Sequence, residues 1–211
     1  MIEILWQSDD AVVCVKPAGI TSQEGGLVDL LRQQLGGEIY PVHRLDKPAA
    51  GVMLFARTAK SAAFYGKAIQ ENRVHKEYLA LLTGVPEAAE GRLEDLLYHD
   101  PRRNKTYVVD RKRRGVREAA LEYWVVAERE GRALVRVRLL TGRPHQIRAQ
   151  FAARGLPLAG DGPYGGGKGP LGLWSVCLTF PLPDGTEKTV ERMPDGLPFA
   201  EFLPVTTIFP G

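Results

Sequence analysis

The chain has 211 residues, of which 44% are hydrophobic and 25% charged, and its formal net charge is +3. This composition is typical of a globular protein and excludes collagen-like, coiled-coil and disulfide-scaffold chains. No run of about 18 apolar residues is present, which excludes a transmembrane helix. The two cysteines, Cys14 and Cys177, lie in apolar runs, so we expect reduced, buried thiols and a cytoplasmic protein.

The first part of the chain alternates short β-rich segments with two helical patterns. Leucines at helical spacing predict a helix over residues 27–35, which Gly36 ends. Thr58 is a suitable N-cap for a second helix that runs to about Asn72. The predicted strands are residues 2–6, 11–15, 39–43, 51–56 and 74–83.

The second part of the chain is rich in arginine. Residues 101–117 hold eight basic residues and one acid, Asp110, and no acidic residue occurs between 131 and 155. In one strand, valines alternate with Arg136 and Arg138, which places the arginines on the face opposite the core. The remaining predictions are strands over 118–126 and 133–139, a helix over 144–154 and a hairpin over 173–191. Together these elements predict an α+β fold with a largely antiparallel sheet.

Reactive side chains of the first half gather in the loop His43-Arg44-Leu45-Asp46, between two apolar segments. A carboxylate beside strong bases can be held ionised as a nucleophile or a base. A solvent-exposed loop in which Asp46 caps a turn explains the same residues. The composition of this loop leaves both interpretations open.

A second reactive group lies where the helix over 144–154 begins. Arg143, His145 and Arg148 fall within two turns, and the free backbone N–H groups of a helix start add to an anion site. An exposed basic helix is the alternative. The basic segments as a whole favour a polyanionic partner, and we predict RNA.

Two other kinds of site are weaker hypotheses. The glycine-rich segment 160–169 lacks the Ser or Thr that a phosphate-binding P-loop needs after its lysine, here Lys168. Four residues of metal-ligand type share no ligand spacing, and neighbouring arginines would repel a cation. A metal-dependent phosphodiesterase would use these four residues, His43, Asp46, His145 and Asp161.

Five segments, in order between residues 16 and 165, resemble the motifs of the RluA family of RNA pseudouridine synthases. They are Lys16-Pro17-Ala18-Gly19, His43-Arg44-Leu45-Asp46 with Gly51, Lys76-Glu77-Tyr78, Thr141 to Arg148, and Gly160 to Gly165. The resemblance implies a pseudouridine synthase fold, in which a mixed, largely antiparallel sheet is flanked by helices and loops. We expect residues 1–211 to form a single catalytic domain. The separate N-terminal RNA-binding domain that such proteins often have is not expected here, because the predicted fold already begins at residue 2.

The resemblance assigns a task to individual residues. Asp46 would be the nucleophile, Tyr78 would stack on the target base, and Arg148 would keep Asp46 ionised. The base would be flipped out of the RNA, with contacts from His43, Arg44, Arg143, His145 and Gln146. Phosphates of ribosomal or transfer RNA would bind Arg102, Arg103, Lys105, Arg111, Lys112, Arg113 and Arg114.

The isomerisation that the resemblance implies needs no cofactor and no metal, and we expect a monomer with no membrane association. One departure from the family pattern is Ala49-Ala50, where the family usually has Thr-Ser. The loss of two hydroxyls affects substrate detail or rate more than reaction class. A non-catalytic RNA-binding module that keeps the fold is the main alternative.

Overall fold

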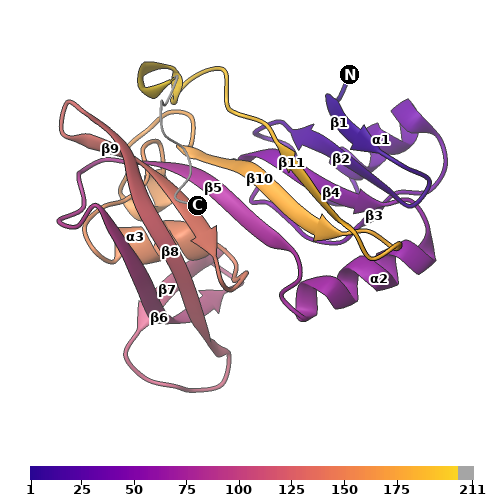
Figure 1. The fold of residues 1–211 in the computed structure, drawn as a ribbon. Helices are drawn as coiled ribbons and strands as arrows, with labels where there is room; N and C mark the ends of the chain where they lie inside the picture. The colour runs from indigo at the N-terminus through magenta and orange to yellow at the C-terminus, as the bar shows by residue number, and fades with distance from the viewer. Residues whose placement is uncertain (204–211) are drawn as a thin grey trace. The chain divides into compact units, whose positions relative to one another are not determined.

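The computed structural model describes residues 1–203 and has a mixed α/β fold with a large, mostly antiparallel sheet (Figure 1). This is the fold class that the sequence predicts. The chain divides into two compact units. The first is Met1–Glu77 with Trp174–Pro194, and the second is Tyr78–Leu173 with the described residues that follow Pro194. No helix within residues 1–203 has the length and apolar character needed to cross a membrane.

The first unit is built on strands whose apolar residues are covered on both faces. All but the first residue of β4 are buried, as expected for a continuous apolar run. β4 pairs antiparallel with β2 and parallel with β10. The elements are β1 (Ile4–Gln7), β2 (Ala11–Lys16), α1 (Leu27–Leu35), β3 (Tyr40–Pro41), β4 (Ala50–Ala56), α2 (Ala59–Gln70), β10 (Leu173–Pro181) and β11 (Glu187–Glu191).

Helix α2 contributes an aromatic ring to the core of this unit. Thr58 caps the helix as predicted, and Ser61 completes a capping box with it. The ring of Tyr65 is fully buried and packs edge-on against Phe180 of β10, with ring centroids 6.0 Å apart. The two cysteines, Cys14 and Cys177, are free and buried in β2 and β10 of the same unit.

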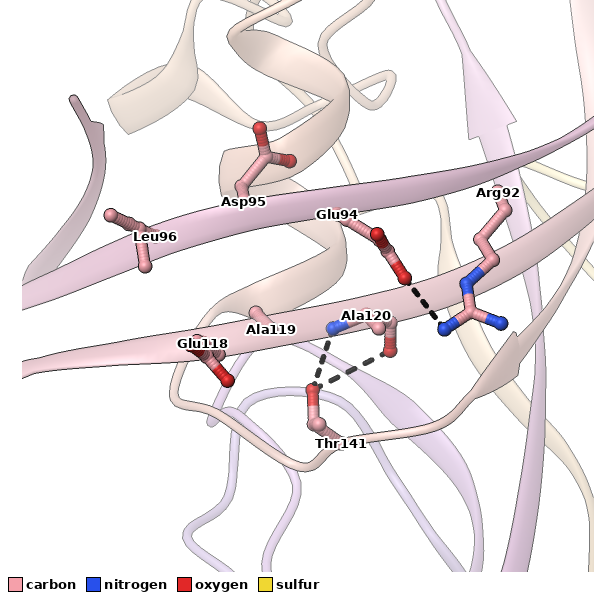
Figure 2. Close-up of a pocket in the computed structure, with 8 residues that line it drawn as sticks. All are labelled: Arg92, Glu94, Asp95, Leu96, Glu118, Ala119, Ala120 and Thr141. Carbon is pink, nitrogen blue, oxygen red and sulfur yellow. Dashed lines mark hydrogen bonds and ion pairs between the residues drawn. The ribbon is translucent and has the colours of Figure 1, made fainter.

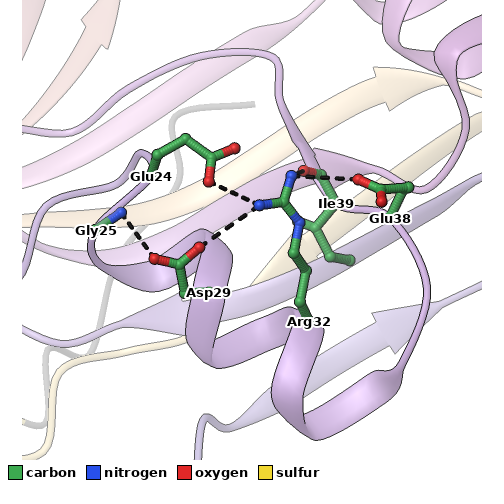
Figure 3. A network of polar contacts seen from close by, with 6 residues as sticks. All are labelled: Glu24, Gly25, Asp29, Arg32, Glu38 and Ile39. Carbon is green, nitrogen blue, oxygen red and sulfur yellow. Dashed lines mark hydrogen bonds and ion pairs between the residues drawn. The ribbon is translucent and has the colours of Figure 1, made fainter.

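Helix α1 is fastened at its polar side by Arg32 (Figure 3). The guanidinium lies 2.7 Å from the carboxylate of Glu24, 3.5 Å from that of Asp29 and 3.3 Å from that of Glu38. It also donates to the backbone carbonyl of Ile39 at 3.3 Å. One side chain thus ties the segments before and after the helix together, which fixes the approach to β3.

The second unit is an antiparallel set of long strands with a short helix. β8 pairs with β9 on one side and with β6 on the other, and β6 pairs with β7. Helix α3 packs against β6 and β7. The elements are the later part of β5 (His75–Leu82), β6 (Glu90–Asp100), β7 (Lys105–Val109), β8 (Val116–Arg129), β9 (Arg132–Leu139) and α3 (Gln146–Ala152).

The structure adds two strands of this unit that were not predicted, and it corrects two predictions. β6 was missed because its leucines, Leu93 and Leu97, are four residues apart as in a helix, and β7 lies within the basic segment 101–117. α3 begins at Gln146 instead of residue 144, since His145 has a left-handed backbone (φ 51°) that a helix cannot include. The face of β9 opposite the valines is also covered, so Arg136 is only 3% exposed.

Candidate active site

The loop between β3 and β4 carries Asp46. The apolar neighbours Leu45 and Ala49 are buried, Asp46 is half-buried, and Arg44 is exposed. The backbone N–H of Ala49 donates to the carbonyl of Asp46 at 3.0 Å and closes a turn directly after it. Buried residues on both sides of Asp46 therefore fix the path of its backbone.

Lys16, the last residue of β2, holds this loop from inside the first unit. Its side chain is fully buried, and its ammonium donates to the carbonyls of Ala49 at 2.6 Å, Lys47 at 3.2 Å and Pro17 at 3.0 Å. Burial lowers the pKa of Lys16 to about 8, and the negative charge of Asp46 opposes this shift. No role for Lys16 was predicted, although a lysine that ends an apolar strand was a usable signal.

His43 attaches the same loop to β4. Its Nε2 accepts the backbone N–H of Leu54 at 3.0 Å, and Ser22 donates its hydroxyl to the carbonyl of Leu45 at 3.3 Å. Burial, and secondarily the charge of Lys76, lowers the pKa of His43 to about 3. His43 is therefore a neutral hydrogen-bond acceptor at physiological pH, consistent with the loop-supporting task that the resemblance implies.

Gly51 brings the start of β4 unusually close to β10. A Cβ atom at this position would lie 2.2 Å from the carbonyl oxygen of Ser175, and the φ angle of Gly51 is 117°. Ser175 in turn donates its hydroxyl to the carbonyl of Val52 at 2.9 Å. Only glycine combines this backbone conformation with this close approach.

The second unit carries Tyr78 and Arg148, both of them buried. Tyr78 belongs to β5, and Arg148 lies in α3. Nε and Nη2 of Arg148 donate to the two carboxylate oxygens of Asp161 at 2.7 and 2.8 Å. Because this ion pair occupies Asp161, its carboxylate is not presented to a metal as the phosphodiesterase hypothesis requires.

The segment that carries Asp161 is joined by backbone hydrogen bonds to the strand that carries Tyr78. The backbone N–H of Ala159 donates to the carbonyl of Leu81 at 2.8 Å, and the N–H of Leu81 donates to the carbonyl of Gly172 at 2.9 Å. These bonds flank Asp161 on both sides in the sequence. The strand of Tyr78 therefore positions the acidic partner of Arg148.

The polar side chains of the turn before α3 form hydrogen bonds within the turn and to the backbone of β8. The Oε1 atom of Gln146 accepts the hydroxyl of Thr141 at 2.8 Å and the backbone N–H of Arg143 at 3.0 Å. Its amide nitrogen donates to the carbonyl of Ala120 at 3.0 Å. Gln146 is only 3% exposed, so the structure gives it a task in shaping the turn. Arg143 donates from Nε to the carbonyl of Glu118 at 2.9 Å.

Most of the predicted phosphate-binding residues are exposed around the β6–β7 and β7–β8 turns. Lys105 is the exception, since its ammonium donates to the carbonyl of Pro163 at 2.5 Å and lies 5.0 Å from the ring centroid of Tyr164. Lys105 is thereby committed to the structure of its own unit. The exposed members are Arg102, Arg103, Arg111, Lys112, Arg113 and Arg114.

A pocket of about 540 Å³ lies on the second unit, beside the turn before α3 (Figure 2). The charged side chains of this lining are all ion-paired: Arg92 with Glu94 at 2.6 Å, Asp95 with Arg154 at 2.9 Å, and Glu118 with Lys112 at 2.5 Å. Paired charges give the pocket little attraction for phosphate. None of the predicted catalytic residues lines this pocket. Its lining is Arg92, Glu94, Asp95, Leu96, Glu118, Ala119, Ala120 and Thr141.

Comparison with known proteins gives one consistent result. The family model described as RNA pseudouridylate synthase matches residues 10–153. An uncharacterized RNA pseudouridine synthase of Zymomonas mobilis is 36% identical over 177 residues, which cover 78% of this chain and 79% of that protein. The tRNA pseudouridine synthase C of Pasteurella multocida is 31% identical, with 78% and 74% covered.

Other relatives are longer than this chain. An uncharacterized RNA pseudouridine synthase of Aquifex aeolicus is 35% identical over 184 residues, which cover 78% of this chain but 56% of that protein. Among solved structures, human RNA pseudouridylate synthase domain containing 1 superposes with a TM-score of 0.79. The sequence identity is 24%, and the match covers 97% of this chain and 86% of the human one, so it shows a shared fold.

Proposed function

Because this chain belongs to the RNA pseudouridylate synthase family, it is an isomerase that acts on uridine in RNA, and we propose that Asp46 is its nucleophile. The reaction breaks the bond between N1 of uracil and the ribose, turns the base and forms a bond from C5. No atom is gained or lost between uridine and pseudouridine. The chemistry therefore needs a positioned nucleophile and no cofactor or metal.

The observation that carries this proposal is the anchoring of the Asp46 backbone. A buried ammonium, a neutral imidazole and a serine hydroxyl hold residues 43–49 in place. A nucleophile needs such fixation, since a misplacement of about 1 Å can cost about a hundredfold in rate.

Tyr78 and Arg148 complete the proposed catalytic set. As the resemblance of the motifs implies, we propose that Tyr78 stacks on the uracil ring and that Arg148 is the arginine that supports Asp46. An arginine suits this task because it keeps its charge at any physiological pH. Stacking is the safer role for Tyr78, since a phenol with a pKa near 10 is a poor base.

The target base has to leave its stack before it reaches Asp46. Arg44 is exposed next to the nucleophile, which supports its proposed task of filling the gap in the RNA. His43 and Gln146 support the loops, and Arg143 and His145 belong to the proposed RNA-contacting turn. We expect the enzyme to act as a monomer in the cytoplasm on ribosomal or transfer RNA.

The exposed arginines and lysine of residues 102–114 are the proposed phosphate-binding surface. Replacing Arg111, Lys112, Arg113 and Arg114 by glutamate should weaken RNA binding and reduce the slope of log Kd against log salt. The slope should fall by about one for each lost phosphate contact. Filter binding at several salt concentrations measures this slope, and an unchanged slope would place the RNA elsewhere.

Tritium release tests the nucleophile directly. Transcripts of ribosomal and transfer RNA that carry [5-³H]uridine release tritium to water when C5 becomes bonded to ribose. The wild type should release tritium, and Asp46→Asn should release none while its RNA affinity stays within about twofold. An active Asp46→Asn variant would refute the assignment, and an inactive wild type would favour a non-catalytic RNA-binding module.

A further inference from the structure

We propose that Asp161 and Tyr164 are positioning residues of the isomerisation, because together they hold the guanidinium of Arg148 in one orientation. The inference rests on the proposed function, in which Arg148 is a catalytic residue. It adds two residues to the reaction that need not touch the RNA. Both come from one short turn of the second unit, Gly162–Tyr164 and the residue before it.

The carboxylate of Asp161 grips Arg148 at two points. Nε and Nη2 of the guanidinium donate to Oδ2 and Oδ1 at 2.7 and 2.8 Å. The side chain of Arg148 is 5% exposed and that of Asp161 is fully buried, so water competes little for this pair. Two parallel bonds from a planar group fix both its position and its plane, which a single bond cannot do.

The ring of Tyr164 fixes the same guanidinium from its face. The Cζ atom of Arg148 lies 4.9 Å from the ring centroid, within the range of a cation–π contact. The ammonium of Lys105 lies 5.0 Å from the same centroid. Tyr164 therefore contacts two cations by its ring, one from α3 and one from β7.

The hydroxyl of Tyr164 keeps the ring in place. It accepts the backbone N–H of Thr106 at 2.8 Å and lies 3.0 Å from Nδ1 of His145, the residue directly before α3. The backbone N–H of Tyr164 also donates to the carbonyl of Asp161 at 3.0 Å. The ring, the carboxylate and the start of α3 are thus linked, so a shift of one moves the others.

A double-mutant cycle tests whether Asp161 acts through Arg148. We expect Asp161→Asn to lower kcat for tritium release by about tenfold to a hundredfold, with KM within about twofold, since it misplaces a catalytic group. Arg148→Ala should have the larger effect, and the double variant should be no slower than Arg148→Ala alone. Effects that multiply, or an unchanged kcat in Asp161→Asn, would overturn the inference.

Exogenous guanidine gives a readout that general damage to the fold would not produce. Added guanidinium should raise the activity of Arg148→Ala, because the carboxylate of Asp161 can bind it. The same addition should not raise the activity of the double variant. Rescue that is equal in both variants, or rescue of neither, would contradict a carboxylate that holds the guanidinium.

Two variants of Tyr164 test the contribution of its ring. They also keep the inference testable if circular dichroism shows that Asp161→Asn does not fold. Tyr164→Phe keeps the ring face but loses the hydroxyl contacts that hold the ring, so we expect its kcat to fall by about threefold. Tyr164→Leu removes the ring face, and we expect a loss of about tenfold. Equal kcat in the two variants would overturn the role of the ring. A wild type without tritium release would instead refute the proposed function itself.

Discussion

The Asp46 loop of the first unit and the Arg148 site of the second are fixed by different means. The Asp46 loop is held through backbone atoms, since Lys16 binds carbonyls and Leu54 donates its N–H to His43. Arg148 is held through its own guanidinium, by Asp161 and Tyr164. A site held by its backbone tolerates changes of its side chains, whereas a site held by its side chains does not.

This difference accounts for the departure at Ala49-Ala50. The anchor that Lys16 uses at position 49 is the backbone carbonyl, which any residue provides. Ala50 begins β4, and its backbone is paired with Trp174. The two hydroxyls of the family pattern are therefore dispensable for holding this loop.

The largest effect should come from Gly51→Ala, which attacks the backbone directly. The added Cβ would meet the carbonyl of Ser175 at 2.2 Å in a backbone conformation that alanine avoids. We expect a loss of about 4 kcal/mol or more in the free energy of unfolding, measured in urea. Gly66→Ala is the control, because nothing lies within 4 Å of its added Cβ in helix α2. Gly66→Ala should raise the free energy of unfolding by about 0.5–1 kcal/mol. An equal loss of stability in both variants would contradict the close approach of Gly51 to Ser175.

Lys16→Met should have the next largest effect. It keeps a long apolar chain but leaves the buried carbonyl of Ala49 without its ammonium donor. We expect a loss of about 2 kcal/mol in the free energy of unfolding and a larger relative loss of tritium release. Lys47→Met is the matched control, since its exposed side chain is replaced while its carbonyl remains. If both variants behave alike, the loop does not depend on Lys16.

The smallest effect should come from His43→Gln and should depend on pH. Folding lowers the pKa of His43 from 6.5 to about 3, so the unfolded chain binds a proton between these values and the folded chain does not. The free energy of unfolding is therefore not reduced by His43 above pH 6.5. As the pH drops below 6.5 toward 3, it falls with a limiting slope of about 1.4 kcal/mol per pH unit. Gln can still accept the N–H of Leu54, and it removes this slope.

Urea unfolding at pH 6 and pH 5 measures the contribution of His43. The wild type should lose about 1.2 kcal/mol more than His43→Gln over this interval, because the unfolded histidine is already partly protonated at pH 6. His75→Gln serves as the control, since His75 is exposed, and it should keep the wild-type slope. An unchanged slope in His43→Gln would show that the imidazole is not held neutral.

Local patterns in the sequence were sufficient for much of the fold. Helices α1 and α2, the Thr58 cap and the β10–β11 hairpin follow from spacing and capping residues that lie next to each other. β6 was missed because its strand conformation comes from pairing with β8 and not from its own alternation. Arg136 was placed on the open face because nothing local shows that both faces of β9 are covered.

The candidate site also has parts that the local sequence predicts and parts that it does not. The loop of Asp46 was identified because its charged residues stand together between apolar strands. The pairing of Arg148 with Asp161 could not be predicted, since the two residues are thirteen positions apart, one in a helix and the other in a glycine-rich segment. The internal contacts of Gln146 and Lys105 could not be predicted either, because polar residues near arginines resemble an exposed surface.

The two buried thiols offer a natural reporter of opening. Burial raises the pKa of Cys14 to about 12, which suppresses the reactive thiolate, and Cys177 is enclosed in the same unit. These are the only cysteines of the chain. An alkylating reagent will therefore modify these thiols only when the first unit opens and exposes its strands. Mass spectrometry of the alkylated protein can thus follow the opening of this unit without any engineered label.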